Sequence, residues 1–423
     1  MPGGEAGAAE EARVRRVGVR WLLAGNAATA AVQLGLAMAL AKQLTEAAVG
    51  DFVLALSIWA PVLMAANMGL RPVVASDAEG EHPFGRYLRV RATALAVAFV
   101  LTTGACTWLV GSEGIVVVLL VGLSKVGESF SELSYGLQQR HAHERTVGVS
   151  LFIRGGVSIS LAIVLLEATG TLEGACLALA VTNLGVALVF DLPRARALEA
   201  RGGASASLHP RGAVLRIVRL GAPLGATAVL LSLTTNVPRY FIEAEVGRAA
   251  LGVFGVLGYG VAAGALVMNA LCNATARDLG ASWIRRDLVR FRGVLRGFVL
   301  TTMGWAGLVV VVALVAGELV LGLMFGPSYA AASEVFVWMM VAGGVAYLGF
   351  AFQYTLTAVR STSIQVVGVA LELVVLTLAC AWWVPQHGLL GGALALLCGA
   401  VARALVLGGA VLRVLGRGAR EVR

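Results

Sequence analysis

Three ionisable residues share one face of an apolar segment that spans about residues 115–138. Lys125, Glu128 and Glu132 stand at i, i+3 and i+7, a spacing that aligns them along one side of a helix. Arg154 lies in the next apolar segment, 147–167, which a short polar link joins to the first. Segments with so short a link are antiparallel neighbours, so Arg154 is expected near the depth of Glu128 and Glu132. A charge at membrane depth is costly and marks a candidate functional site.

Two interpretations of this cluster are open. In the functional one, Lys125 or Arg154 binds an anionic group of a substrate, and Glu128 or Glu132 binds a coupling proton. In the structural one, a Glu–Arg pair locks two helices together while the Lys125 ammonium extends towards the membrane interface. The position of Glu132, nearer the cytoplasm, favours the structural interpretation for that residue.

Other polar residues within or beside apolar segments are also open to a functional or a structural interpretation. Glu372 and Arg403 lie at matching depths of two adjacent segments, and we interpret them as a structural ion pair. Arg71 closes an apolar segment, where it either faces the inner mouth of a pathway or only ends the helix. Arg239 lies on the opposite side of the membrane and either lines a lumen or forms a salt bridge with Glu243 at the outer surface. Asn236 either hydrogen-bonds a polar substrate or contacts a neighbouring helix.

The composition indicates the elements that position these residues. The 423-residue chain is 58% hydrophobic and 13% charged, with a mean hydropathy of +0.84. Apolar runs of about 18 or more residues predict membrane-spanning helices. We expect an all-α polytopic membrane protein with about 12 transmembrane helices. Almost all basic residues then fall on one side of the membrane, and Arg239 and Arg248 stand alone in outer loops. The positive-inside rule places both termini in the cytoplasm.

The two halves of the chain resemble one another. Val49-Gly50, between two apolar runs, recurs as Val246-Gly247, 197 residues later. Internal repeats are common in transporters. We therefore expect two pseudo-symmetric six-helix bundles and short polar ends, with these boundaries: a disordered cytoplasmic N-terminus at 1–19, the first bundle at 20–192, a cytoplasmic linker at 193–218, the second bundle at 219–412 and a cytoplasmic tail at 413–423.

Several motifs resemble bacterial oligosaccharide (O-antigen and capsule, Wzx-like) flippases. They are Leu233 to Glu243 with Ala249 to Phe254 and Tyr259, Gly50-Asp51-Phe52, Gly136-Leu137-Gln138-Gln139, and Arg154 with Gly174-Ala175. These flippases form the polysaccharide branch of the multidrug/oligosaccharidyl-lipid/polysaccharide (MOP) exporter superfamily. The resemblance implies a V-shaped arrangement of two bundles around a lumen. It also implies alternating-access translocation of a polyprenyl-diphosphate-linked oligosaccharide in a bacterial cytoplasmic (inner) membrane, for O-antigen, capsule or exopolysaccharide biosynthesis.

On this reading the diphosphate and sugars meet Arg154, Lys125, Arg239, Arg71 and Asn236, and a polysaccharide polymerase is a possible partner besides membrane lipids. Arg suits such a ligand because its planar fork donates two hydrogen bonds to phosphate. One alternative is an ion-coupled drug or cation antiporter of the same superfamily. That class typically uses an acid in its first helix, whereas 21–41 contains none. A second alternative is a membrane polysaccharide polymerase.

The residue pattern disfavours an enzyme, a metal site, a cofactor and nucleic-acid binding. No nucleophile–base pair, metal-spaced histidine set or phosphate-binding glycine loop with lysine is found in the sequence. The five cysteines are scattered among apolar runs and predict neither disulfides nor metal ligation.

Overall fold

The structure is a computed structural model that describes residues 3–77, 82–109, 114–201 and 212–421. The described residues form helices and connecting turns, without a β-strand. With the ten long apolar segments given below, this confirms the expected all-α polytopic membrane fold. The helices up to the middle of the chain are α1 (Gly3–Gln43), α2 (Glu46–Asn67), α3 (Leu70–Ser76), α4 (Phe84–Leu109), α5 (Ile115–Arg140), α6 (Glu144–Thr169), α7 (Leu172–Gly185), the π-helix η1 (Val186–Asp191) and α8 (Leu192–Arg201). The later helices are α9 (Ala213–Glu245), α10 (Arg248–Ile284), α11 (Leu288–Met324), α12 (Pro327–Ala330), α13 (Ser333–Ala358) and α14 (Ser363–Glu421).

Membrane crossings can be counted from helix length and polarity. Ten segments of the described residues are long and apolar enough to cross a membrane. Helix α5 is not among them, yet it has the same 26 residues as α4 and α6; its charged residues set it apart. Helix α14 counts once although it turns sharply at Gly388, where φ is 55° and ψ is −126°. Adding α5 and dividing α14 brings the number to the expected twelve.

The chain divides into two compact units. The first comprises residues 1–44 and 55–229, and the second comprises 45–54 and 230–423. The units therefore differ from the contiguous bundles 20–192 and 219–412 expected from hydropathy, because α2 and α9 each contribute to both. An apolar profile records only the length of a helix, so it cannot show that the two ends of one helix pack against different partners.

The N-terminal segment also differs from expectation. Residues 3–19, expected to be disordered, are the first turns of α1. This stretch is rich in Ala, Glu and Arg, which have high helix propensity, and it continues an apolar helix that needs no new nucleus.

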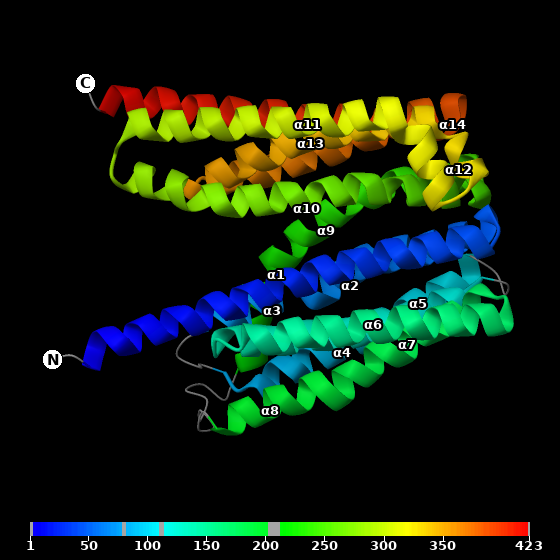
Figure 1. Cartoon of the computed structure of the whole chain (residues 1–423), viewed down its shortest axis with the longest axis horizontal. Coiled ribbons are helices and arrows are strands. Elements are labelled where there is room, and N and C mark those ends of the chain that lie inside the picture. The colour runs from blue at the N-terminus through cyan, green and yellow to red at the C-terminus, as the bar shows by residue number, and fades with distance from the viewer. Residues whose placement is uncertain (1–2, 78–81, 110–113, 202–211, 422–423) are drawn as a thin grey trace. The chain divides into compact units, whose positions relative to one another are not determined.

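Helix α5 lies at the centre of the first unit, in contact with α3, α4, α6, α7, η1 and α8 (Figure 1). Its glycines allow this close packing. A Cβ on Gly127 would overlap the backbone of Asn183 and Leu184, and one on Gly136 would meet the backbone of Arg71. Because α5 is enclosed by protein on several sides, its polar residues face neighbouring helices as well as lipid.

In the second unit, α13 packs against α10, α11 and α14 (Figure 1). The start of α2 also belongs to this unit and crosses the start of α10. Cβ atoms on Gly50 and Gly252 would overlap the carbonyl oxygens of Arg248 and Glu46, respectively. Asp51 pairs with Arg248 across this crossing, and the two residues are 197 positions apart. This is the offset of the internal repeat, so equivalent positions of the two halves meet here.

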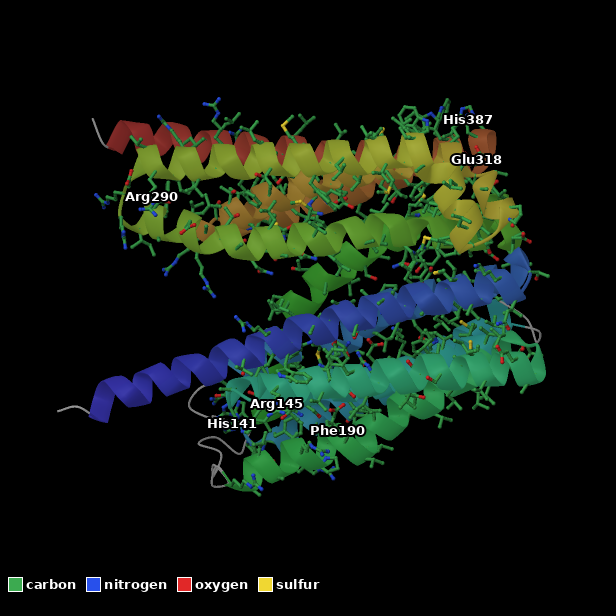
Figure 2. All side chains as sticks on the ribbon, viewed as in Figure 1. His141, Arg145, Phe190, Arg290, Glu318 and His387 are labelled. Carbon is green, nitrogen blue, oxygen red and sulfur yellow. The ribbon has the colours of Figure 1, made fainter. Side chains whose placement is uncertain are left out.

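The two ends of the second unit differ in their residues. Arg290 lies at one end, and Glu318 and His387 lie at the other (Figure 2). Arg290 lies in the first turn of α11, whereas Glu318 lies near the end of that helix and His387 directly precedes the sharp turn of α14 at Gly388.

Candidate functional site

The first unit contains a buried charge cluster between α5 and α6. The Lys125 ammonium contacts a Glu128 carboxylate oxygen at 2.7 Å. The other Glu128 oxygen lies 3.8 Å from Nη2 of Arg154, whose side chain is only 9% exposed. The structure thus brings Lys125, Glu128 and Arg154 together. Nη1 of Arg154 is buried and has no hydrogen-bond partner among the described residues. A buried guanidinium with an unused donor can bind an additional anion.

Glu132 and Arg71 form a second group on the same side of α5. Arg71 Nη1 lies 3.9 Å from Glu132, and its Nε donates to the Gln139 side chain at 3.4 Å. The guanidinium also stands 5.5 Å from the centre of the Tyr135 ring. About a third of each charged side chain is exposed, so this pair contributes little to stability. Arg71 is positioned by the short helix α3, which follows a break at Met68 and Gly69, both with positive φ.

Asp191 is a buried acid that the sequence pattern does not single out as a site residue. Ser150 donates a 3.0 Å hydrogen bond to its carboxylate, and Tyr135 contacts the Ser150 hydroxyl at 2.7 Å. Asn183 further extends the polar interior by donating to Ser124 at 2.7 Å. In the sequence, Asp191 stands at the end of an apolar run and reads as the boundary of a helix. Only the fold shows that the chain continues as helix and turns this carboxyl inward.

Arg91 is a second buried ionisable residue that the sequence pattern does not single out, because it stands before the apolar run of its helix. It lies inside α4, is 1% exposed, and donates to the side-chain and backbone oxygens of Asn67, the latter at 3.0 Å. Asn67 is the last residue of α2. Arg91 therefore supplies hydrogen-bond donors to the backbone carbonyl at the end of α2, which is a structural role.

The second unit contains a cavity of about 510 Å³ between α9, α10, α13 and α14. Its wall includes Arg239, Thr234, Glu372 and Arg403 among mostly apolar residues. Two arginines and one glutamate give this wall an excess positive charge. A concave, largely apolar site with a few polar groups is the usual form of a ligand pocket.

Glu372 and Arg403 lie side by side in that wall. Arg403 Nη1 is 3.2 Å from the Glu372 carboxylate, and their side chains are 5% and 12% exposed, respectively. Arg403 also donates to the Gln353 side chain and stands 5.3 Å from the centre of the Phe350 ring. The pair was expected to be structural, and its burial means that either charge alone would be costly.

Arg239 lies within α9, not in an outer loop, because the helix continues to Glu245. Its Nη1 donates to Oδ1 of the Asn236 side chain at 3.1 Å, one turn earlier. Asn236 in turn donates to the Ser232 backbone oxygen at 2.7 Å. Asn236 therefore orients Arg239 at the cavity. Glu243, the alternative partner of Arg239, instead accepts a hydrogen bond from Arg248 Nε at 2.8 Å.

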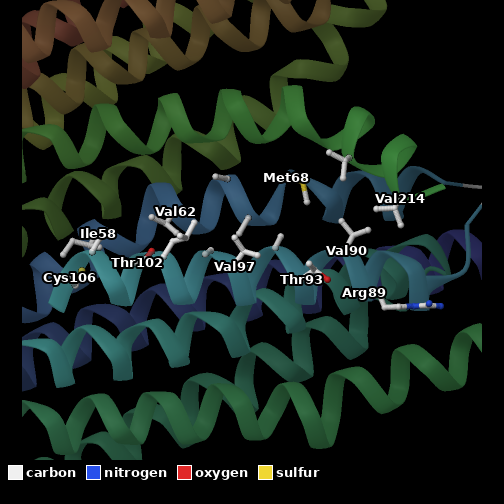
Figure 3. A pocket seen from close by; sticks show the side chains of 17 residues that line it. Ile58, Val62, Met68, Arg89, Val90, Thr93, Val97, Thr102, Cys106 and Val214 are labelled. Atoms are coloured by element: carbon white, nitrogen blue, oxygen red, sulfur yellow. The ribbon is translucent and has the colours of Figure 1, made fainter. Parts of the chain in front are cut away.

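An apolar hollow of about 910 Å³ lies in the first unit between α2, α4 and the start of α9. Arg89 stands at one end of it, and Ile58 and Cys106 lie at the other (Figure 3). Such a shape suits an extended hydrocarbon chain with an anionic end.

Metal ligands are not gathered anywhere in the described ranges, where no group of three or more His, Cys, Asp or Glu side chains could hold an ion. The cysteines are free thiols, four of them buried.

Comparison with known proteins identifies the fold. No protein-family model matches the chain. The structure of the lipid II flippase MurJ in an inward closed conformation aligns with a TM-score of 0.73 and 10% identity, covering 92% of this chain and 86% of that one. An inward-facing multidrug resistance MATE family transporter of the MOP superfamily aligns with a TM-score of 0.72 and 12% identity, covering 93% and 96%. The chain therefore has the fold of MOP superfamily transporters.

One curated protein is similar in sequence. The capsular polysaccharide biosynthesis protein CapF of Staphylococcus aureus is 23% identical over 287 residues, which cover 66% of this chain and 70% of that protein. Together with the ten long apolar segments, these similarities make the chain a multi-pass membrane protein with a transporter fold.

Proposed function

We propose that this chain is a flippase that moves a polyprenyl-diphosphate-linked oligosaccharide across the bacterial cytoplasmic membrane for polysaccharide biosynthesis. It would work by alternating access, with both termini in the cytoplasm and substrate binding that differs between two conformations. A polysaccharide polymerase that uses the translocated oligosaccharide is a candidate partner. Similarity to a lipid II flippase in fold, and to a capsule biosynthesis protein in sequence, supports this class of substrate.

The observation that carries the proposal is the sign of the charges at membrane depth. The cavity of the second unit has two arginines and one glutamate in its wall, and the cluster of the first unit joins Lys125 and Arg154 to one glutamate. Each site therefore keeps about one positive charge beyond its internal pairing. A diphosphate complements such a site, and a hydrogen bond to a charged group is worth more where water is scarce.

The lipid part of the substrate also has a matching surface. The apolar hollow of the first unit could hold part of a polyprenyl chain, and Arg89 at its end matches the negative charge where that chain meets its diphosphate. Asn236 and Thr234, at or beside the cavity of the second unit, offer hydrogen-bonding groups for sugar hydroxyls.

A drug or cation antiporter is the second candidate, because a MATE transporter has the same fold. A cationic substrate needs an accessible acid, however. Glu128 is paired with two cations, and Glu372 is paired with Arg403. The described charges therefore favour an anionic substrate.

A proteoliposome assay tests the choice. The full-length chain is reconstituted with a polyprenyl-diphosphate trisaccharide that carries a nitrobenzoxadiazole dye, and external dithionite bleaches the dye in the outer leaflet. Flipping predicts bleaching beyond the outer-leaflet fraction. Arg154→Gln and Arg239→Gln should each slow it by at least tenfold, because one lost charge-assisted hydrogen bond is worth about 1.5–3 kcal/mol.

Arg290→Gln is the matched control, since Arg290 is exposed at the end of the second unit (Figure 2). It should bleach at the rate of the unaltered protein. Bleaching equal to that of empty liposomes, together with transport of ethidium by the same vesicles, would replace the flippase proposal with the antiporter.

A further inference from the structure

The buried acid Asp191 has an unusual setting. It ends the π-helix η1, and none of its surface is exposed. π-Helices are rare and often occur at functional sites. The wider turn of this segment changes which face the following residues present, and the carboxyl is directed between α5 and α6 instead of outward.

The contacts of Asp191 are hydroxyl groups and not cations. Ser150 donates to Oδ2 at 3.0 Å, so Tyr135 must donate to Ser150 at 2.7 Å. The hydroxyl of Ser131 faces the same carboxyl. The second oxygen, Oδ1, makes no hydrogen bond with any described residue. An ionised carboxylate so placed has hydroxyl groups as neighbours and no cation of the described chain within ion-pair distance, and a proton on Oδ1 removes this buried charge.

Charged groups surround this position on three of the elements that pack against η1, which are α5, α6, α7 and α8. They are Glu128 and Tyr135 on α5, Arg154 on α6 and Arg194 on α8. The ionisable groups of α7, Glu173 and Cys176, lie near its opposite end. Arg194 stacks on the Phe190 ring, with 3.5 Å between the guanidinium carbon and the ring centre. Arg154 is therefore the neighbouring cation that links Asp191 to the charge cluster.

Glu128 is less suited to take up a proton. It touches the Lys125 ammonium at 2.7 Å and the Arg154 guanidinium at 3.8 Å, and both cations favour its charged form. Among the described residues, Asp191 has no cation within ion-pair distance. The two acids thus differ in environment, and only one of them can change charge without breaking an ion pair.

We propose that Asp191 is a proton-binding site that sets how strongly Arg154 attracts the diphosphate of the substrate, a role that rests on the proposed function. A proton on Oδ1 makes Asp191 neutral. Arg154 is then balanced by Glu128 alone, and Glu128 is already shared with Lys125. The free Nη1 of Arg154 therefore meets a more positive surrounding, which strengthens its attraction for a diphosphate. By linkage, a bound diphosphate strengthens proton binding by the same factor.

Infrared difference spectroscopy of the purified full-length chain tests the site without requiring transport. A spectrum recorded at low pH minus one at high pH should contain the carbonyl stretch of a buried protonated carboxyl. Asp191→Asn should abolish this band, and Glu128→Gln should leave it in place. Ser150→Ala removes a hydrogen bond to the ionised form, so the titration midpoint should move to higher pH by about one to two units.

The outcomes separate the two proposals. A band that persists in Asp191→Asn, with no shift in Ser150→Ala, overturns the proton site, even if the chain flips lipid. A band that disappears when sodium replaces choline at constant pH also overturns it, in favour of a sodium site. Since Asp191→Asn can fail to fold, the Ser150→Ala shift provides an independent measurement, and a midpoint that does not move counts against the proposal. Failure of the dithionite assay alone leaves the infrared result intact.

Discussion

Breaking the Glu372–Arg403 pair should destabilise the second unit strongly. The charges are 3.2 Å apart, and the side chains are 12% and 5% exposed. At an effective dielectric constant of about 20, the Coulomb attraction at that distance is about 5 kcal/mol. Arg403→Met leaves Glu372 buried without its cation, and Glu372→Gln leaves Arg403 with the Gln353 side chain and the Phe350 ring but no carboxylate. Removal of one partner of a buried pair typically costs about 3–5 kcal/mol.

The double variant Glu372→Gln with Arg403→Met should recover most of that loss. It leaves no buried charge, and its side chains have nearly the original volume. Replacement of a whole buried pair by neutral groups is often close to neutral in stability. We expect the double variant to lie within about 2 kcal/mol of the unaltered chain, which gives a coupling energy of several kcal/mol in a double-mutant cycle.

The free energy of unfolding can be measured in mixed micelles with SDS as the denaturant. If the losses of the two single variants add in the double variant, charge coupling is not what holds α14 together here. The same proteins then enter the dithionite assay. A stable double variant that no longer flips lipid would show that this pair also serves the substrate, in addition to its structural role.

Two further changes test the packing and the charge cluster. Gly252→Ala places a methyl group against the Glu46 backbone and should lower the free energy of unfolding by about 1–3 kcal/mol in the SDS titration. Gly280→Ala, which has open space around it, should stabilise α10 by about 0.5–1 kcal/mol. Equal effects of the two substitutions would contradict the close crossing of α2 and α10. Lys125→Met should cost less than about 1 kcal/mol, because this side chain is 30% exposed and its Glu128 partner keeps Arg154, but it should slow flipping as Arg154→Gln does. Unchanged flipping in Lys125→Met would restrict the diphosphate site to Arg154.

The helices were predictable because membrane helices follow from apolar length, and length can be read from the sequence. Helix α5 illustrates the limit of this reading. Its charges lower its mean hydropathy, and only its place between two short connections identified it as a crossing. The juxtaposition of Lys125 and Glu128 was also within reach, since helical spacing alone places them on one face.

Asp191 and Arg91 could not be predicted, for a common reason. Each stands near the end of an apolar run, where a charged residue normally meets water or lipid head groups. Their burial depends on contacts from distant parts of the chain, Ser150 for Asp191 and Asn67 for Arg91. The division of α2 between two units has the same origin, because hydropathy does not record packing partners.

The structural and functional interpretations of the buried charges do not exclude each other. Each unpaired buried donor costs free energy, so a buried guanidinium that stabilises the fold through some of its donors still gains from a new acceptor at the others. Arg154 leaves Nη1 without a partner, and Arg403 leaves Nε without one among the described residues. Both residues hold helices together through one part of the guanidinium and retain a donor for another acceptor. A diphosphate can supply acceptors to such donors without breaking the pairs that keep the helices in place. This explains how a transporter could bind and release an anion at membrane depth while its bundles remain folded.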